Sequence, residues 1–282
     1  MLEQTIFNAI LLGLTYVVVA SGLTLVFGVM HIFNFAHGEL YMLGGFIGYF
    51  LLEFMGVHFF PAMVLTMAVM FFLGVLIERY IFRPFRDRLI PSMIISLSLS
   101  LILSGFALLA FTENDLSIDS PFHGSLQFGG VFIPLERLMI IIFCFLIMAS
   151  MFFFLHRFKW GRALRAVAID PEAAILQGIN IDLVYSMSFG ISSALAAAAG
   201  VMILPLFKVN AYMGIPAVNN SLAVIVLGGM GSIPGSVLGG LLLGMVNAFS
   251  TTYIGGTIGG IFAFIMIIAM IIVRPKGLLG HE

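Results

Sequence analysis

Long apolar stretches separated by short polar segments dominate the chain from residue 5 to residue 273. The run LMIIIFCFLIMASMFFFL, for example, carries no charged residue and shows no alternation of apolar and polar positions. A membrane-spanning helix needs about 20 apolar residues, whereas a membrane-spanning strand needs about 10 residues of alternating character. The pattern therefore predicts helices, because a helix satisfies its own backbone hydrogen bonds within lipid.

These stretches predict an all-α, polytopic transmembrane bundle of about eight spans, in one domain that occupies residues 1–282. Region 217–250 complicates the count, because two short apolar pieces flank the sequence GGMGSIPGS. That region forms either two crossings or a pair of broken or re-entrant helices. The spans are expected at 5–29, 38–53, 60–78, 91–111, 138–156, 184–205, 217–250 and 256–273.

The composition excludes a water-soluble protein. Of 282 residues, 61% are hydrophobic and only 9% are charged, against roughly 25% charged in globular proteins. The net charge of −1 gives no electrostatic footprint for nucleic acid. The single cysteine, Cys144, excludes a disulfide framework or a cysteine-based zinc site within one chain.

The basic residues predict how the chain is oriented in the membrane. Ten of the twelve Lys and Arg residues fall after the third, the fifth and the last predicted spans. The positive-inside rule makes that side cytoplasmic. Loop 112–136 and the N-terminus are therefore expected outside and the C-terminus in the cytoplasm, with Lys208 as an external exception. The ten residues are Arg79, Arg83, Arg86, Arg88, Arg157, Lys159, Arg162, Arg165, Arg274 and Lys276.

Loop 157–183 is the longest cytoplasmic segment on this reading and contains a predicted short helix. Asp170 suits the N-cap, Pro171 the first helical position and Glu172 the positive end of the helix dipole. Gly178 can end the helix in a left-handed conformation. We expect a helix of about seven residues, preceded by a short turn in GRALRAVA. Such a helix either rests on lipid headgroups or docks into a cytoplasmic partner.

Three segments together resemble a known family. They are FGVMHIFNFAHGELYMLGGFIGY near the N-terminus, GRALRAVAIDPEAAILQGINIDLV in the cytoplasmic loop and VIVLGGMGSIPGSVLGGLLLGMVNA near the C-terminus. Each resembles the corresponding segment of the permease subunits of branched-chain amino-acid ABC importers, and they occur in the same order. The size and span count also resemble the shorter, LivH-type members.

The resemblance implies a mechanism and a set of partners. Such permeases work in pairs, with a related subunit or a second copy, on two cytoplasmic ABC ATPase subunits that bind the ATP and magnesium. No cofactor is expected in this chain. A periplasmic or extracellular binding protein delivers the substrate, and the loop helix couples the permease to the ATPase. The coupling residues implied here are Gly161, Arg162, Arg165, Asp170, Pro171, Glu172, Ala173, Ala174 and Gly178.

Polar residues within the spans are candidates for the translocation path. The cluster HIFNFAHGEL contains His31, Asn34, His37 and Glu39, which could satisfy the backbone of a broken helix, line the path or relay protons. Its spacing fits no standard zinc helix, so no metal site is expected. Charged residues are scarce within the spans, which predicts a path with few fixed charges and leaves specificity to an external receptor. The path candidates are Asn34, His37, Glu39, Asn219, Asn220, Ser232 and Asn247.

The function implied by the resemblance is ATP-driven import of leucine, isoleucine and valine across a bacterial or archaeal cytoplasmic (inner) membrane. The alternative is a proton-coupled carrier or channel for a small solute such as urea or an amide, with His37 and Glu39 carrying the protons. The sequence contains no GxxxxGK[ST] phosphate loop. No arrangement of catalytic residues is evident, so the chain is expected to be a transport subunit and not an enzyme.

Overall fold

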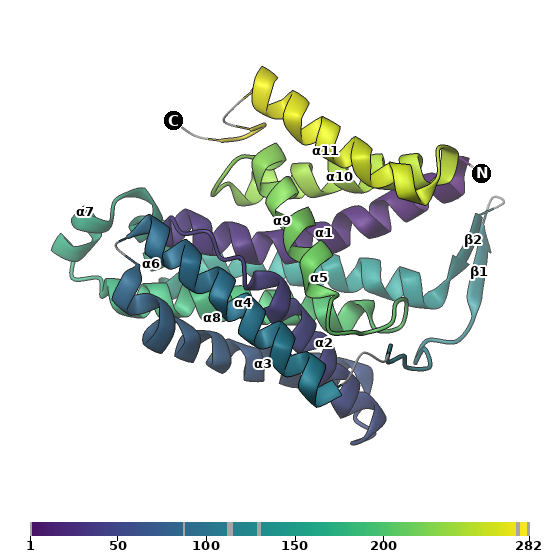
Figure 1. The fold of residues 1–282 in the computed structure, drawn as a ribbon, viewed down its shortest axis with the longest axis horizontal. Coiled ribbons are helices and arrows are strands. Elements are labelled where there is room, and N and C mark those ends of the chain that lie inside the picture. The colour runs from purple at the N-terminus through teal and green to yellow at the C-terminus, as the bar shows by residue number, and fades with distance from the viewer. Residues whose placement is uncertain (1, 87, 112–114, 129–130, 275–276, 281–282) are drawn as a thin grey trace.

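The computed structural model is a bundle of helices with one small antiparallel hairpin at one end (Figure 1). The structure describes residues 2–280 except 87, 112–114, 129–130 and 275–276. The α-helices are α1 (Leu2–Met30), α2 (His37–Glu53), α3 (Phe59–Ile77), α4 (Leu89–Phe111), α5 (Leu135–Arg157), α6 (Lys159–Ile169), α7 (Pro171–Leu176), α8 (Ile181–Ile203), α9 (Gly214–Gly228), α10 (Ile233–Tyr253) and α11 (Gly256–Val273). A π-helical turn, η1 (Glu78–Phe82), and a 3₁₀ turn, η2 (Arg83–Phe85), continue α3, and the hairpin strands are β1 (Ser125–Phe128) and β2 (Val131–Pro134).

Six of the described helices are long and apolar enough to cross a membrane, which confirms the predicted polytopic helical fold. They are α1, α3 with its continuation to Phe85, α4, α5, α8 and α10. Helices α1 and α8 lie at the centre of the bundle, since 78% of the most apolar window of each is buried. Helix α4 is at the periphery, with only 17% of its window buried.

Region 217–250 contains one short helix and one full-length helix. Helix α9 has 15 residues and α10 has 21, and the turn Gly229–Ser232 joins them. At 1.5 Å per residue α9 is about 22 Å long, shorter than the roughly 30 Å core of a bilayer. Its first residue, Gly214, packs against Gly38 in the first turn of α2, so α9 begins inside the bundle.

Helix α2 also begins inside the bundle. Helix α1 ends at Met30, His31 takes a left-handed conformation with φ of 57°, and the chain turns back without helical structure. His37, the first residue of α2, places its Nε2 2.9 Å from the carbonyl oxygen of Val19. Because α1 continues from Val19 to Met30, this contact lies about 16 Å before the end of α1. Residues 31–36 therefore form a re-entrant segment.

Small residues allow the central helices to approach closely. A Cβ atom added to Gly44 of α2 would overlap the backbone of Ala197 in α8, and one added to Gly244 of α10 would overlap Gly13 in α1. Gly235 and Gly239 in α10 are similarly packed against the backbone of α9. These glycines are therefore packing residues of the bundle core.

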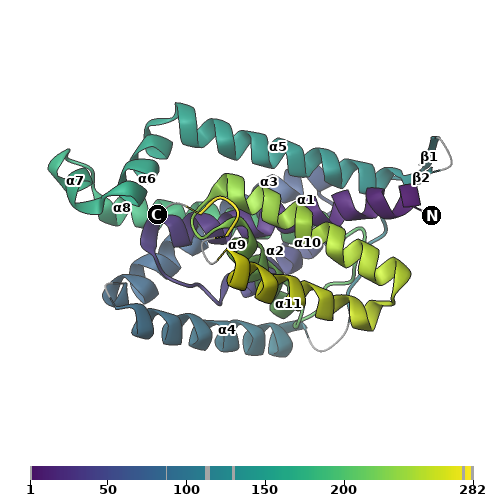
Figure 2. The same ribbon diagram turned by 90° about the horizontal axis from the view of Figure 1, so that it is seen from above.

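The predicted basic segments gather at one end of the molecule. Helices α6 and α7 lie at that end with the α3–α4 connection, whereas the N-terminus and the hairpin lie at the opposite end (Figure 2). Arg83 after α3 bonds Asp182 at the start of α8. Leu278 in the C-terminal segment donates its N–H to Leu227 at the end of α9. This clustering of the basic segments agrees with the predicted orientation, which itself stays a prediction. Of the basic residues in these segments, Lys276 lies outside the described residues.

Candidate functional site

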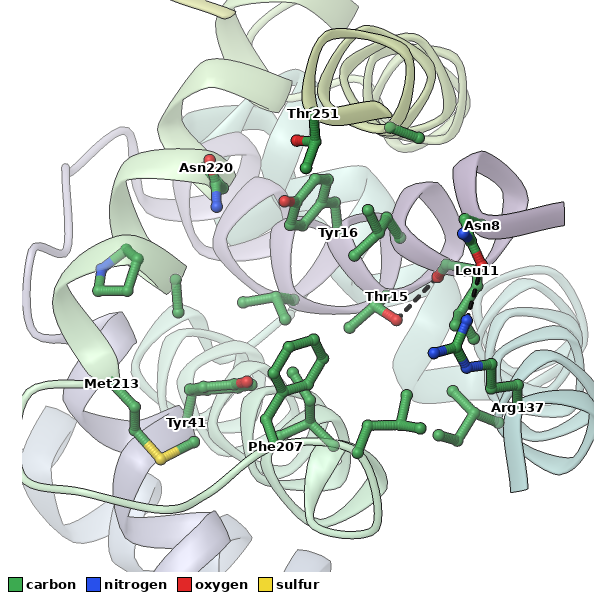
Figure 3. Close-up of a pocket in the computed structure, with 18 of the residues that line it drawn as sticks. Asn8, Leu11, Thr15, Tyr16, Tyr41, Arg137, Phe207, Met213, Asn220 and Thr251 are labelled. Atoms are coloured by element: carbon green, nitrogen blue, oxygen red, sulfur yellow. Dashed lines mark hydrogen bonds between the residues drawn. The ribbon is translucent and has the colours of Figure 1, made fainter. Parts of the chain in front are cut away.

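A cavity of about 430 Å³ opens between the central helices, toward the end that carries the N-terminus (Figure 3). Residues of α1, α2, α5, α8, α9 and α10 line it, together with the connection from α8 to α9. The volume falls within the range of about 300–1,000 Å³ that is typical of small-molecule sites. The lining residues are Asn8, Leu11, Leu12, Thr15, Tyr16, Val19, Tyr41, Arg137, Ile140, Ile203, Leu206, Phe207, Met213, Pro216, Ala217, Asn220, Ala248, Thr251 and Thr252.

Arg137, in the first turn of α5, is the single charged side chain among these lining residues. Its Nη1 donates a hydrogen bond of 2.7 Å to Oδ1 of Asn8 in α1 (Figure 3). Its Nε is buried and has no hydrogen-bond partner among the residues that the structure describes. Sequence reasoning did not single out Arg137 as a candidate site residue. Its position one residue before the predicted span 138–156 could have identified it as a candidate for the path.

Two of the predicted path residues lie at this cavity. Asn220 of α9 lines it directly. Asn247 of α10 stands behind the lining and donates a hydrogen bond of 3.1 Å to the hydroxyl oxygen of Tyr16, which does line it. Asn219, the neighbour of Asn220, is exposed on another face of α9 and is not part of the lining.

A second cavity, of about 300 Å³, lies at the end that carries the basic segments. Residues of α1, α5 and α6 and of the turn between α9 and α10 line it, and they include Arg165 and Ser232. The hydroxyl of Ser232 also caps α10 by accepting a hydrogen bond of 3.1 Å from the N–H of Gly235. Thr24 of α1 lines this second cavity, whereas Val19 of α1 lines the first. The same stretch of α1 therefore runs past both.

Asn34 and His37 are buried within the bundle and make hydrogen bonds there, although Nδ2 of Asn34 has no partner among the described residues. Asn34 is 1% exposed and its Oδ1 accepts a hydrogen bond of 3.1 Å from the N–H of Ala36. His37 is fully buried between the Val19 carbonyl of α1 and the Ser192 hydroxyl of α8, at 2.9 and 3.4 Å. Both residues hold the re-entrant segment in place, and neither lines the described cavities. Their part in a translocation path stays a prediction.

Glu39 is a buried carboxylate at the meeting point of two helix N-termini. It is 1% exposed, lies in the first turn of α2, and its Oε1 accepts a hydrogen bond of 3.1 Å from Ser100 of α4. A Cβ on Gly214, the first residue of α9, would lie 2.8 Å from its Oε2. The partial positive charges of both N-termini favour an anion at this point. Burial opposes the charge, and Oε2 has no hydrogen-bond partner among the described residues.

The predicted helix of the cytoplasmic loop is present as α7, and its capping is confirmed. Asp170 accepts a hydrogen bond of 3.0 Å from the N–H of Ala173, Pro171 is the first helical residue, and Gly178 has a φ of 79°. The preceding turn is longer than expected, because α6 extends over eleven residues. The reason is packing: Gly161 lies so close to Phe154 and Leu155 of α5 that a Cβ would overlap them.

The end of this loop exposes apolar side chains. Ile169 and Leu176 are each 86% exposed and Ile175 is 58% exposed, while Ala174 is buried against the rest of the loop. Arg162, Arg165, Glu172 and Ala173 are also exposed. We name the exposed residues Ile169, Glu172, Ala173, Ile175 and Leu176 the loop tip. A surface of this kind is typical of a protein–protein contact.

A network of charged residues that sequence reasoning missed joins α3 to α8. Glu78 in η1 is completely buried and accepts a hydrogen bond from Ser186 of α8. Arg83 and Arg86 each lie 3.9 Å from a carboxylate oxygen of Glu78, and both also bond Asp182 in the first turn of α8. We name these five residues the α3–α8 clamp. It fixes the start of α8, directly after the loop tip, to the end of α3.

The fold and this site define a polytopic membrane protein with a central cavity and an exposed loop tip. A family model described as "Branched-chain amino acid transport system / permease component" matches residues 5–271, and the chain belongs to this family. The permease protein BraD of a high-affinity branched-chain amino acid transport system from Pseudomonas aeruginosa is 36% identical over 294 residues, which cover 99% of this chain and 95% of the relative.

Further relatives extend the similarity to other organisms. The corresponding permease protein LivH from Escherichia coli is 35% identical over 298 residues, again covering 99% of this chain and 95% of the relative. A probable LivH permease from the archaeon Methanocaldococcus jannaschii is 26% identical over 245 residues, covering 82% of this chain and 75% of the relative. A solved structure, "PsaBC from Streptococcus pneumoniae in complex with Fab", has a similar fold, with a TM-score of 0.52, 15% identity and coverage of 95% and 91%.

Proposed function

We propose that this chain is the membrane-spanning permease subunit of an ATP-driven importer of branched-chain amino acids, located in the cytoplasmic membrane. The observation that carries the proposal is the similarity along nearly the full chain to permease proteins of high-affinity branched-chain amino acid transport systems. The central cavity supports it, because its wall combines aliphatic side chains with a few polar groups. Membership of this family disfavours the proton-coupled carrier or channel as the alternative.

The proposed complex contains a second permease, either related or identical, two ATPase subunits and an external binding protein. The ATPase subunits bind and hydrolyse ATP, and this chain supplies the path. The loop tip is the contact with an ATPase subunit, because three of its side chains are apolar and exposed at the end where the basic residues gather. Asp170, Pro171 and Gly178 set the shape of this contact, whereas Gly161 and Ala174 hold the loop together.

The connection from the loop tip to the bundle provides a route for coupling between the ATPase and the permease. Helix α7 leads through Gly178 and Asn180 directly into α8, whose first turn is held by the α3–α8 clamp. A displacement of the loop tip by the ATPase is therefore passed both to α8, in the bundle core, and to α3.

The test is uptake by a purified complex. The tagged chain is purified in mild detergent together with the subunits that accompany it, and the complex is reconstituted in vesicles with ATP inside and the binding protein outside. Accumulation of radiolabelled leucine that requires ATP is the expected result. Accumulation without ATP, or a chain that purifies without any ATPase, would overturn the proposal.

A further inference from the structure

The cavity lining contains one charged side chain, that of Arg137. The predicted path with few fixed charges gives no role to this side chain. Arg137 brings one positive charge to a lining that contains no Asp or Glu among its described residues. No ion pair to Arg137 is found within the described part of the chain, and its one hydrogen-bond partner there is the neutral amide of Asn8. Such a charge favours an anionic group beside it.

We propose that Arg137 binds the carboxylate of the transported amino acid in this cavity, and that the aliphatic wall beside it accepts the substrate side chain. The inference rests on the proposed function, since it assumes that an amino acid passes through this cavity. It adds a specificity-determining residue within the permease, so that selection does not depend on the binding protein alone.

The geometry of Arg137 suits a carboxylate. Asn8 engages Nη1 and so fixes the guanidinium plane, while Nε stays without a partner among the described residues. Nε and Nη2 together form the edge of the guanidinium that binds a carboxylate through two parallel hydrogen bonds. Figure 3 shows the guanidinium extending from α5 to the edge of the cavity beside Asn8.

The apolar part of the lining suits a branched aliphatic side chain. It is formed by Leu11 of α1, Ile140 of α5, Ile203 at the end of α8, and Leu206 and Phe207 in the connection that follows α8. Ile140 lies three residues after Arg137 on the same face of α5. A substrate whose carboxylate meets Arg137 would therefore place its side chain against this apolar surface, where burial is favourable.

The opposite part of the cavity suits an ammonium group. The rings of Tyr16 and Tyr41 and the amide of Asn220 face the cavity there (Figure 3). Tyrosine rings and amide oxygens attract cations without a fixed negative charge. The described lining contains no carboxylate that would pair with Arg137 in place of the substrate carboxylate. The site therefore fits an apolar amino acid and disfavours the amide of the same amino acid.

Protection of an engineered cysteine tests the proposal without relying on transport. In the complex, this chain carries Cys144→Ala, which removes its single native thiol, and Ala217→Cys, which places a thiol in the cavity lining, and only modification of this chain is followed. Modification by an impermeant, negatively charged methanethiosulfonate is followed in the presence of leucine or leucinamide. We expect leucine to slow the reaction at least about threefold more than leucinamide, because only leucine carries the carboxylate that Arg137 binds. Ser117→Cys, in the exposed loop outside the cavity, is the matched control and should be insensitive to both.

Two variants of Arg137 separate its charge from its shape. Arg137→Gln should slow the anionic reagent relative to a cationic one by at least about threefold and abolish the difference between leucine and leucinamide. Arg137→Lys should keep the preference for the anionic reagent but weaken protection by leucine, because lysine lacks the planar fork.

The outcomes separate this inference from the proposed function. Equal protection by leucine and leucinamide, or no protection by either, in a complex that imports leucine would overturn the inference and leave the proposed function intact. A complex that does not import leucine would instead contradict the proposed function. The comparison of the two ligands uses the native Arg137, so it remains decisive even where a substitution of Arg137 prevents folding.

Discussion

At the scale of single residues, backbone conformation and buried charge decide which positions matter most. Gly178 could be assigned from the sequence, because a glycine after a capped helix is the usual way to end it in a left-handed conformation. The role of Glu39 could not, because it depends on Gly214 and Ser100, which are distant in the chain. Sequence reasoning placed Glu39 in the predicted span 38–53 but could not show that two helix N-termini meet there.

Gly178→Val tests the conformation of the coupling loop. The position has open space around it, so no clash is expected, but a β-branched residue is strained at a φ of 79°. The strain, about 1–2 kcal/mol, should displace the loop tip and reduce ATP-dependent leucine uptake severalfold at unchanged membrane abundance. Gly178→Asn is the control, since Asn tolerates the left-handed region, and should retain most uptake. Full uptake in Gly178→Val would contradict a coupling role for this turn.

Glu39→Gln tests whether the carboxylate compensates the two helix dipoles. The amide keeps the size and the hydrogen bond with Ser100 but removes the charge. Each helix N-terminus contributes about 0.3–1 kcal/mol to a nearby anion, which is less than the cost of burying a carboxylate, so we expect the unfolding temperature of the purified chain to be unchanged or higher. Uptake by the reconstituted complex should remain insensitive to a protonophore in both forms. A protonophore that abolishes uptake only in the native form would instead assign proton transfer to Glu39.

At the scale of elements, the apolar pattern predicted most helices but not the points where two of them begin. Span 184–205 corresponds to α8 and span 91–111 to α4, because both are continuous apolar runs. Helices α2 and α9 are different, since each starts within the bundle on contacts with another helix. Hydropathy reports only the length of an apolar run, so it cannot show that residues 31–36 fold back along α1.

The α3–α8 clamp gives a prediction at this scale. Arg86→Met removes one of the two guanidinium groups beside the buried Glu78 and should destabilise the protein, but by less than the about 3–5 kcal/mol that a buried charge without any partner costs, because Arg83 still lies 3.9 Å from Glu78. Asp182→Asn should cost less than about 1 kcal/mol, because the side chain of Asp182 is 46% exposed. Thermal unfolding in detergent measures both changes.

A second substitution checks that the cause is the buried charge. Glu78→Gln added to Arg86→Met should recover part of the lost stability, because the buried carboxylate that lost one of its two arginine partners is then neutral. A double variant that is less stable than Arg86→Met alone would show that Arg86 stabilises the fold through other contacts, such as its stacking on Tyr185.

At the scale of the whole molecule, the distribution of charge predicts how the bundle is placed in the membrane. The loop tip and the basic connections lie at one end, and the hairpin and the N-terminus at the other (Figure 2). The positive-inside rule assigns the first end to the cytoplasm. The main cavity then opens toward the outside, where a binding protein would deliver substrate, and the loop tip faces the ATPase subunits.

Accessible thiols on the two ends test this orientation. In a Cys144→Ala background, Ser117→Cys lies in the loop before the hairpin and Gln177→Cys lies at the end of α7, and both positions are exposed. A membrane-impermeant maleimide added to intact cells, or to spheroplasts where an outer membrane is present, should modify Ser117→Cys and leave Gln177→Cys unmodified until the cells are lysed. The Cys144→Ala chain without an added thiol is the control and should not react. Modification of Gln177→Cys in intact cells would reverse the orientation, and the loop tip could then not reach a cytoplasmic ATPase.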